Sequence, residues 1–185
     1  MKKIIVVTGN AGKYNEIKKI LDSFGISSER INLSFEECSD TVEKISVEKA
    51  QKAFAVVKKP LIVDDTGVFF EAYNNFPGHH AKRIYNAIGF KGIMKLLDGE
   101  NRNALFKSAV CFTDGRMTKV FVGELRGRIT TEVYPTSRKD LPYEQIFVPD
   151  GINAPMSKLS VDEKNSISHR AKAIKMFAKW FLENF

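Results

Sequence analysis

The opening of the chain combines a buried apolar stretch, a glycine loop and an amphipathic helix. Residues 4–7 are apolar and β-branched throughout, which is typical of a strand buried on both faces. Small and turn-forming residues follow at positions 8–12. After Lys13, apolar residues recur at helical spacing, at Ile17, Ile20, Leu21 and Phe24. The pattern predicts a helix whose N-terminus faces a cleft, where Lys13 and the helix dipole can attract an anion.

The rest of the pattern mixes strands with helices. Strands are predicted at residues 31–35, 61–63, 68–70, 104–113, 117–125, 126–133 and 145–148, and helices at 46–58, 81–88, 92–97 and 166–183. Asp114-Gly115 supplies a hairpin turn. We expect one α/β domain over residues 1–185, with a mixed central sheet flanked by helices and two lobes around a nucleotide-binding cleft.

The net charge of the chain indicates the kind of partner, and its cysteine content indicates the cellular compartment. Lys and Arg number 29 against 22 Asp and Glu, a net charge of +7 that favours polyanionic partners. Cys38 and Cys111 lack metal-ligand spacing, and two distant thiols fit a reducing compartment. No apolar run approaches transmembrane length. We therefore expect a cytoplasmic protein without a membrane partner.

Two adjacent carboxylates follow the apolar residues 61–63. An unpaired buried carboxylate is costly, so Asp64 and Asp65 should meet a metal, a hydrogen-bond donor or solvent. An ordinary Asp-rich turn would explain the same residues; alternatively, Asp65 with Glu37 would suit Mg²⁺. Because neighbouring strand residues point to opposite faces, only one aspartate should face the loop that ends at Lys13, and Asp65 is the one expected.

The last predicted helix begins with cations that oppose its dipole. Ser166 or Ser168 caps it, and His169 and Arg170 fall near its first turn. The arrangement is favourable if an anion or an electron-rich oxygen lies nearby, although a solvated pair is the alternative. Tyr143, after a proline-flanked loop, offers either a stacking ring or a packed side chain. His79-His80 are interpreted as turn residues.

Three of these segments together resemble one family. Residues 8–13 with Glu16 are similar to the motif T-G-N-x-x-K-x-x-E, and residues 63–67 through Pro77-Gly78 are similar to D-D-[ST]-G…P-G. Residues 163–170 match E-K-x-x-x-S-H-R. The chain thus resembles, nearly end to end, the inosine triphosphate pyrophosphatases. These enzymes hydrolyse non-standard purine nucleoside triphosphates (ITP, dITP, XTP) to the monophosphate and pyrophosphate.

The resemblance implies a set of site residues and partners. It implies Mg²⁺ on Glu37 and Asp65, with Asp65 also accepting a proton from the attacking water. A homodimer is implied, and no stable nucleic-acid partner is expected. The implied substrate-binding residues are Thr8, Gly9, Asn10, Ala11, Gly12, Lys13, Lys49, Thr66, Leu141, Pro142, Tyr143, Glu144, Lys164, His169 and Arg170.

Two departures from the family pattern concern the substrate contacts. Thr66 replaces the usual Ser and keeps its hydroxyl, whereas Glu144 replaces the usual Asp and lengthens the carboxylate. Arg170 and Lys164 would be left unpaired against adenine but paired with a 6-oxo purine. Two other interpretations stay open: a basic RNA- or DNA-binding module that stacks bases on aromatic rings, and a nucleotide sensor without turnover.

Overall fold

A computed structural model describes residues 2–35, 39–137 and 140–185. Its strands form a seven-stranded sheet in the order β2-β1-β3-β5-β6-β7, with β4 paired to β3. The strands are β1 (Lys2–Val7), β2 (Ile26–Ile31), β3 (Leu61–Phe70), β4 (Pro77–Gly78), β5 (Asn103–Thr113), β6 (Thr118–Ile129) and β7 (Phe147–Pro149). The helices are α1 (Ala11–Ser23), α2 (Val42–Val57), α3 (Ala81–Leu96), α4 (Val161–Ile167) and α5 (His169–Asn184).

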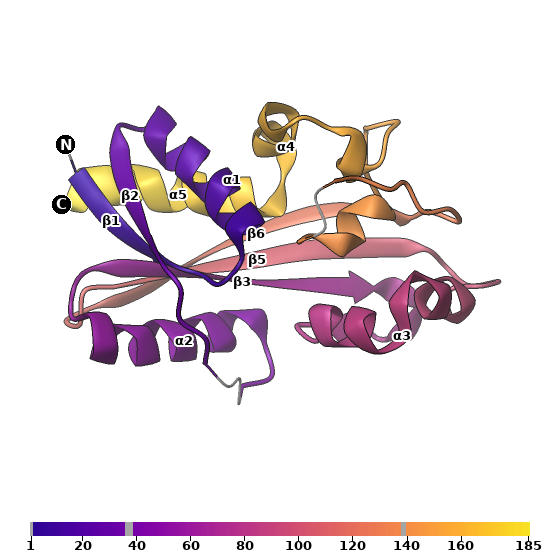
Figure 1. The fold of residues 1–185 in the computed structure, drawn as a ribbon, viewed down its shortest axis with the longest axis horizontal. Coiled ribbons are helices and arrows are strands. Elements are labelled where there is room, and N and C mark those ends of the chain that lie inside the picture. The colour runs from indigo at the N-terminus through magenta and orange to yellow at the C-terminus, as the bar shows by residue number, and fades with distance from the viewer. Residues whose placement is uncertain (1, 36–38, 138–139) are drawn as a thin grey trace.

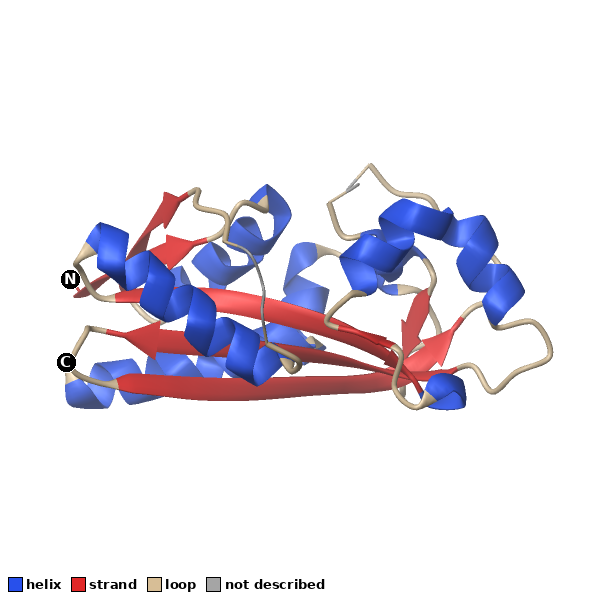
Figure 2. Ribbon diagram, turned by 90° about the horizontal axis from the view of Figure 1, so that it is seen from below, coloured by secondary structure: helices blue, strands red, loops and turns tan. Residues whose placement is uncertain are grey.

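The sheet is mixed, and helices cover both of its faces. β1 runs parallel to β2 and β3, whereas β3, β5, β6 and β7 pair antiparallel. Figure 1 shows α1 and α5 on one side of the long strands and α2 and α3 on the other. Seen from below, the long strands span both lobes (Figure 2). The predicted fold class is confirmed.

Strand alternation divides the first lobe into two cores. Ile4 and Val6 on β1 pack with α1 and α5, whereas Ile5 and Val7 pack in the cluster that contains α2. On β3, Ile62 belongs to the α1–α5 side, and its neighbours Leu61 and Val63 belong to the α2 side. The same alternation sets the direction of the polar residues farther along β3.

The second lobe forms around the distal half of the long strands. Val68 and Phe70 pack there with Phe106, with α3 and with the segment before β7. α3 is kinked at Gly89, whose φ of 61° is outside the helical region. The two helices predicted at 81–88 and 92–97 are therefore the two halves of α3.

Several boundaries differ from the prediction. The strand expected at residues 31–35 lies at Ile26–Ile31 instead, because Leu33 and Phe35 pack against the α2 cluster rather than into the sheet. β3 continues through Asp64-Asp65-Thr66-Gly67, where a break was expected, because each residue pairs with β5. The last predicted helix, at residues 166–183, is α5 and begins at His169, because Ser168 caps it and residues 166 and 167 end the separate helix α4. In the described part of the chain, no helix is long and apolar enough to cross a bilayer.

Gly123 allows α5 to lie directly on β6. A Cβ atom at this position would be 2.0 Å from the carbonyl oxygen of His169 and 2.7 Å from the amide nitrogen of Ala173. Both contacts are to backbone, so no side-chain rotation relieves them. The missing side chain therefore fixes the height of the α5 N-terminus above the sheet.

Replacing Gly123 with Ala should destabilise the protein because the helix must move away from the strand. We expect a loss of about 1–3 kcal/mol or more, measured as a lower midpoint in urea unfolding. An unchanged midpoint would show that α5 is not held against β6 as described.

Candidate active site

A cleft of about 560 Å³ opens where the two lobes meet. The end of β1, the start of α1, the middle of β3 and the start of α3 contribute to its walls. Its lining includes Thr8, Gly9, Asn10, Ala11, Lys13, Lys49, Asp64, Asp65, Thr66, His79, Lys82, Tyr85, Asn86, Asp140 and Pro142. Cations and carboxylates thus face one another across the same space.

The glycine loop is ordered by its own side chains. Asn10 caps α1 because its Oδ1 accepts a hydrogen bond from the Lys13 N–H at 2.9 Å. The Thr8 hydroxyl accepts a hydrogen bond from the Asn10 N–H at 3.2 Å. Lys13 then reaches across to β3, where its Nζ lies 2.9 Å from Asp64 Oδ2 and 3.1 Å from Thr66 Oγ1. The predicted strand, loop and helix are confirmed.

The two aspartates point to opposite faces of β3, but not in the expected assignment. Asp64 continues the face of Ile62 and meets α1 and α5, so Asp64 rather than Asp65 faces Lys13. Asp65 continues the α2 face, where its Oδ1 accepts a hydrogen bond from Lys49 Nζ at 2.8 Å. The expectation that Asp65 faces the loop was wrong. The alternation of side chains along β3, and not nearness to the expected end of the strand, decides which aspartate faces Lys13.

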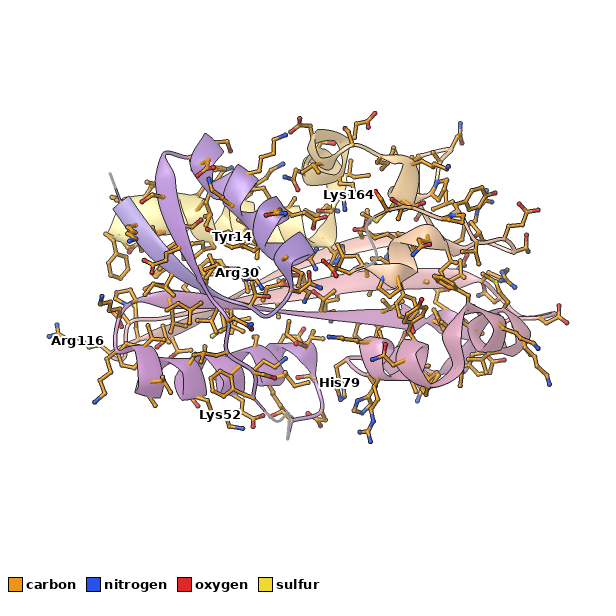
Figure 3. The ribbon with its side chains drawn as sticks, viewed as in Figure 1. Tyr14, Arg30, Lys52, His79, Arg116 and Lys164 are labelled. Carbon is orange, nitrogen blue, oxygen red and sulfur yellow. The ribbon has the colours of Figure 1, made fainter. Side chains whose placement is uncertain are left out.

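A buried charge network connects α1, β3, α4 and α5. We use this term for the carboxylates of Glu16, Asp64 and Glu144 with the cations Lys13, Lys164 and Arg170. Arg170 donates to Glu16 Oε2 at 2.6 Å, to Asp64 Oδ2 at 3.1 Å and to Thr66 Oγ1 at 3.2 Å. Lys164, labelled in Figure 3, contacts Glu16 and donates to both carboxylate oxygens of Glu144 at 2.8 Å. Three negative and three positive groups therefore meet with little exposure to solvent.

The neighbouring charges decide which members are ionised. Burial opposes ionisation of Asp64, but Lys13, Arg170 and a hydrogen bond from Ser108 hold its pKa well below the usual range. Burial also opposes ionisation of Glu16, yet Arg170 and Lys164 lower its pKa. Glu144 contacts only one of these cations, so burial and the charge of Glu16 raise its pKa. Arg170 stays charged because Asp64 and Glu16 outweigh its burial and raise its pKa.

A smaller inner pocket of about 100 Å³ adjoins the cleft. It shares Thr66, Lys82, Asp140 and Pro142 with the cleft and is otherwise lined by Val68, Ala81, Phe106, Leu141, Tyr143, Glu144, His169 and Arg170. Burial and then the charge of Arg170 lower the pKa of His169 well below its usual value, so its ring is neutral. Within the described residues, neither ring nitrogen of His169 has a hydrogen-bond partner. An unsatisfied buried imidazole is costly, which makes this pocket a candidate for a polar, flat ligand.

The carboxylates suit a hard cation only in part. The described residues hold no group of three or more His, Cys, Asp or Glu side chains arranged around a metal. Mg²⁺ commonly takes one or two carboxylates and completes its shell with water and substrate phosphates. Asp65 fits such a role because its side chain is 10% exposed to the cleft, whereas that of Asp64 is 1% exposed. The other predicted ligand, Glu37, lies outside the described residues.

Most of the predicted site residues line one of the two cavities. Gly12 and Lys164 line neither: Gly12 faces Asp140, and Lys164 acts on the inner pocket through Glu144. Tyr143 lines the inner pocket, but its hydroxyl donates to the Ala81 carbonyl at 2.9 Å, and its ring packs in the second lobe. Ser168 is confirmed as the cap of α5.

Some residues of the site escaped the sequence analysis. His79, interpreted only as a turn residue, lines the cleft together with Lys82 from α3. Ser108, on β5, donates a hydrogen bond to Asp64. The register of β5 against β3, which brings the two residues together, could not be predicted from the sequence. Glu16 belongs to the first family motif, but its pairing with Lys164 and Arg170 was not predicted.

Comparison with known proteins agrees with this geometry. The model of the Ham1 family matches residues 4–180. A dITP/XTP pyrophosphatase of Methanopyrus kandleri is 42% identical over 98% of this chain and 97% of its own. A dITP/XTP pyrophosphatase of Saccharolobus solfataricus is 40% identical over 99% of this chain and 95% of its own. The solved structure of a HAM1 protein from Coxiella burnetii has a TM-score of 0.83, covers 99% of this chain and 100% of its own, and at 23% identity supports the fold alone. The chain therefore belongs to the Ham1 family.

Proposed function

We propose that this protein hydrolyses dITP, ITP and XTP to the monophosphate and pyrophosphate, and so removes them from the nucleotide pool. The observation that carries the proposal is that the two cavities adjoin and share lining residues. A cleft with lysines and a glycine loop lies beside a pocket lined by buried hydrogen-bonding groups. The triphosphate would occupy the first and the purine the second. The names of the relatives from Methanopyrus and Saccharolobus support the same activity.

The phosphates would be held at the start of α1. Thr8, Asn10 and Lys13 line the cleft there, and Lys49 extends into it from α2. These cations and the positive end of the helix dipole neutralise phosphate charge. Bound Mg²⁺ would supply further charge neutralisation on the phosphate oxygens.

Asp65 is our candidate for the proton acceptor. Water attacks the α-phosphorus, the bond from that phosphorus to the β-phosphate bridging oxygen breaks, and pyrophosphate leaves. Asp65 lines the cleft and receives the proton of the attacking water. Lys49 donates a hydrogen bond to this carboxylate at 2.8 Å and orients it. Asp64 suits this role less, because both of its oxygens accept hydrogen bonds from internal groups.

The inner pocket would select the base. Arg170 presents donors to an oxygen at position 6, where adenine has an amino group instead. Glu144, fixed by Lys164, can accept the N1–H of hypoxanthine or xanthine, whereas N1 of adenine carries no hydrogen. The neutral ring of His169 offers one donor and one acceptor to the same edge.

The remaining proposals follow the family resemblance and the composition. We propose Mg²⁺ as the metal, held by Asp65 and Glu37. We propose one functional domain over residues 1–185, a homodimer as the assembly and the cytoplasm as the compartment.

A panel of purine triphosphates with Mg²⁺ tests the function. We expect pyrophosphate and monophosphate from ITP, dITP and XTP at rates far above those with ATP or GTP. Release of orthophosphate, or equal rates with ATP, would exclude the proposed reaction. Tight nucleotide binding without turnover would favour a sensor, and salt-dependent binding to RNA or DNA without turnover would favour a nucleic-acid module.

Asp65 and Asp64 should respond differently to the same change. Asp65→Asn should bind nucleotide and fold normally but lose turnover by about 10²–10⁴ or more, because both the base and a metal ligand are lost. Asp64→Asn should keep much more turnover at saturating substrate and Mg²⁺, while its KM rises because Lys13 and Arg170 lose a shared anion. Initial rates and melting curves of both variants provide the measurement.

A milder variant separates positioning by Asp64 from misfolding. Ser108→Ala removes one hydrogen bond to Asp64 and should shift KM in the same direction by less. If Asp64→Asn is inactive while folded and Asp65→Asn remains active, the assignment of the proton acceptor is wrong.

A further inference from the structure

Arg30 contacts the glycine loop from a strand that contributes no predicted site residue. It lies on β2, and its side chain is half-buried. Its Nε donates to the Thr8 carbonyl at 3.0 Å, and its Nη2 donates to the Gly9 carbonyl at 2.9 Å. Figure 3 labels Arg30 near the start of α1. Among the described residues, it forms no ion pair and does not line the cleft, so it approaches the loop from behind.

These two hydrogen bonds fix the direction of two consecutive peptide groups. In a trans peptide, the carbonyl and the following N–H point in opposite directions. The N–H groups of Gly9 and Asn10 therefore point away from Arg30. The Asn10 N–H meets the Thr8 hydroxyl on that side, and both residues line the cleft.

The peptide groups on either side of Gly9 could rotate without such a constraint. Gly9 belongs to both peptide groups, and a residue without a Cβ can change its backbone angles at little steric cost. A rotated peptide would present a carbonyl oxygen to the cleft instead of an N–H. That oxygen would repel a phosphate where the N–H would bind it.

We infer that Arg30 is a positioning residue for the phosphate loop. Its forked guanidinium holds the carbonyls of Thr8 and Gly9 on the far side. The Gly9 N–H then points toward the substrate phosphates, and the Asn10 N–H holds the Thr8 hydroxyl on the same side. The fork matters as well as the charge, because one planar group reaches two acceptors at once. This inference rests on the proposed function of the loop as the triphosphate site.

Binding of inorganic tripolyphosphate tests this role without turnover. Titration calorimetry in metal-free buffer would compare the natural protein with Arg30→Gln, Arg30→Lys and the matched control Arg116→Gln. Arg116 lies in the hairpin turn, at a distance from the cleft (Figure 3). We expect Arg30→Gln to weaken binding by about 10- to 100-fold, the scale of hydrogen bonds to a charged group.

The Lys variant separates geometry from charge. Arg30→Lys should also bind about tenfold more weakly, because one ammonium cannot hold both carbonyls in the same plane. Arg116→Gln should bind like the natural protein. The ratio of kcat/KM for ITP over ATP should stay unchanged in all variants, because Arg30 does not contact the inner pocket.

Several outcomes would overturn the inference. Full binding by Arg30→Lys would show that only charge matters, and full binding by Arg30→Gln would show that Arg30 has no role. A changed ITP-to-ATP ratio would place its effect on the base, and no tripolyphosphate binding by the natural protein would remove the loop as a phosphate site. Failure of the proposed function is distinct, because it would appear as absent pyrophosphate release from ITP while the binding differences persist.

Discussion

The position of Arg170 between Asp64 and Glu16 constrains the rest of the site. A guanidinium this deeply buried is tolerable only with paired carboxylates, and removal of one partner of such a pair typically costs about 3–5 kcal/mol. Glu16 comes from α1, Asp64 from β3 and Arg170 from the first turn of α5. The pairing therefore sets these three elements relative to one another. Gly123 permits it, because α5 can approach the sheet closely at that level.

The same network relates the two cavities. Asp64 contacts Lys13 on the cleft side and Arg170 on the inner-pocket side, and Thr66 Oγ1 receives hydrogen bonds from both cations. Glu144 extends the network into the inner pocket through Lys164. The groups proposed to hold the phosphates and those proposed to read the base are thus fixed to one framework. A ligand with too few phosphates would leave the proposed phosphate-binding groups unpaired. A ligand with the wrong base edge would leave the groups of the inner pocket unpaired.

Much of this arrangement was predictable because it depends on local rules. The buried strand at residues 4–7 and the loop before Lys13 follow from residue type and spacing alone, and the structure confirms them. A serine cap for the last helix was also predictable, and the structure selects Ser168 over Ser166. The directions of Asp64 and Asp65 were not predictable. Shifting β3 by one residue would move each side chain from the side of the sheet covered by α2 to the side covered by α1 and α5. Ser108 contacts Asp64, 44 positions away in the sequence, and Arg30 contacts Thr8, 22 positions away. Their roles depend on tertiary register, which no local pattern contains.

We propose that the donors of Arg170, held by Asp64 and Glu16, distinguish a 6-oxo purine from adenine. The most direct measurement is the ratio of kcat/KM for ITP over ATP in Arg170→Lys and Arg170→Ala, with melting curves to confirm folding. Arg102→Lys is the matched control, because Arg102 donates to the carbonyls of Leu97, Ile129 and Thr130 and lines neither cavity. We expect the ratio to fall roughly 5- to 150-fold, equivalent to about 1–3 kcal/mol, in the Arg170 variants only. A ratio that stays at the natural value in folded Arg170 variants would contradict it.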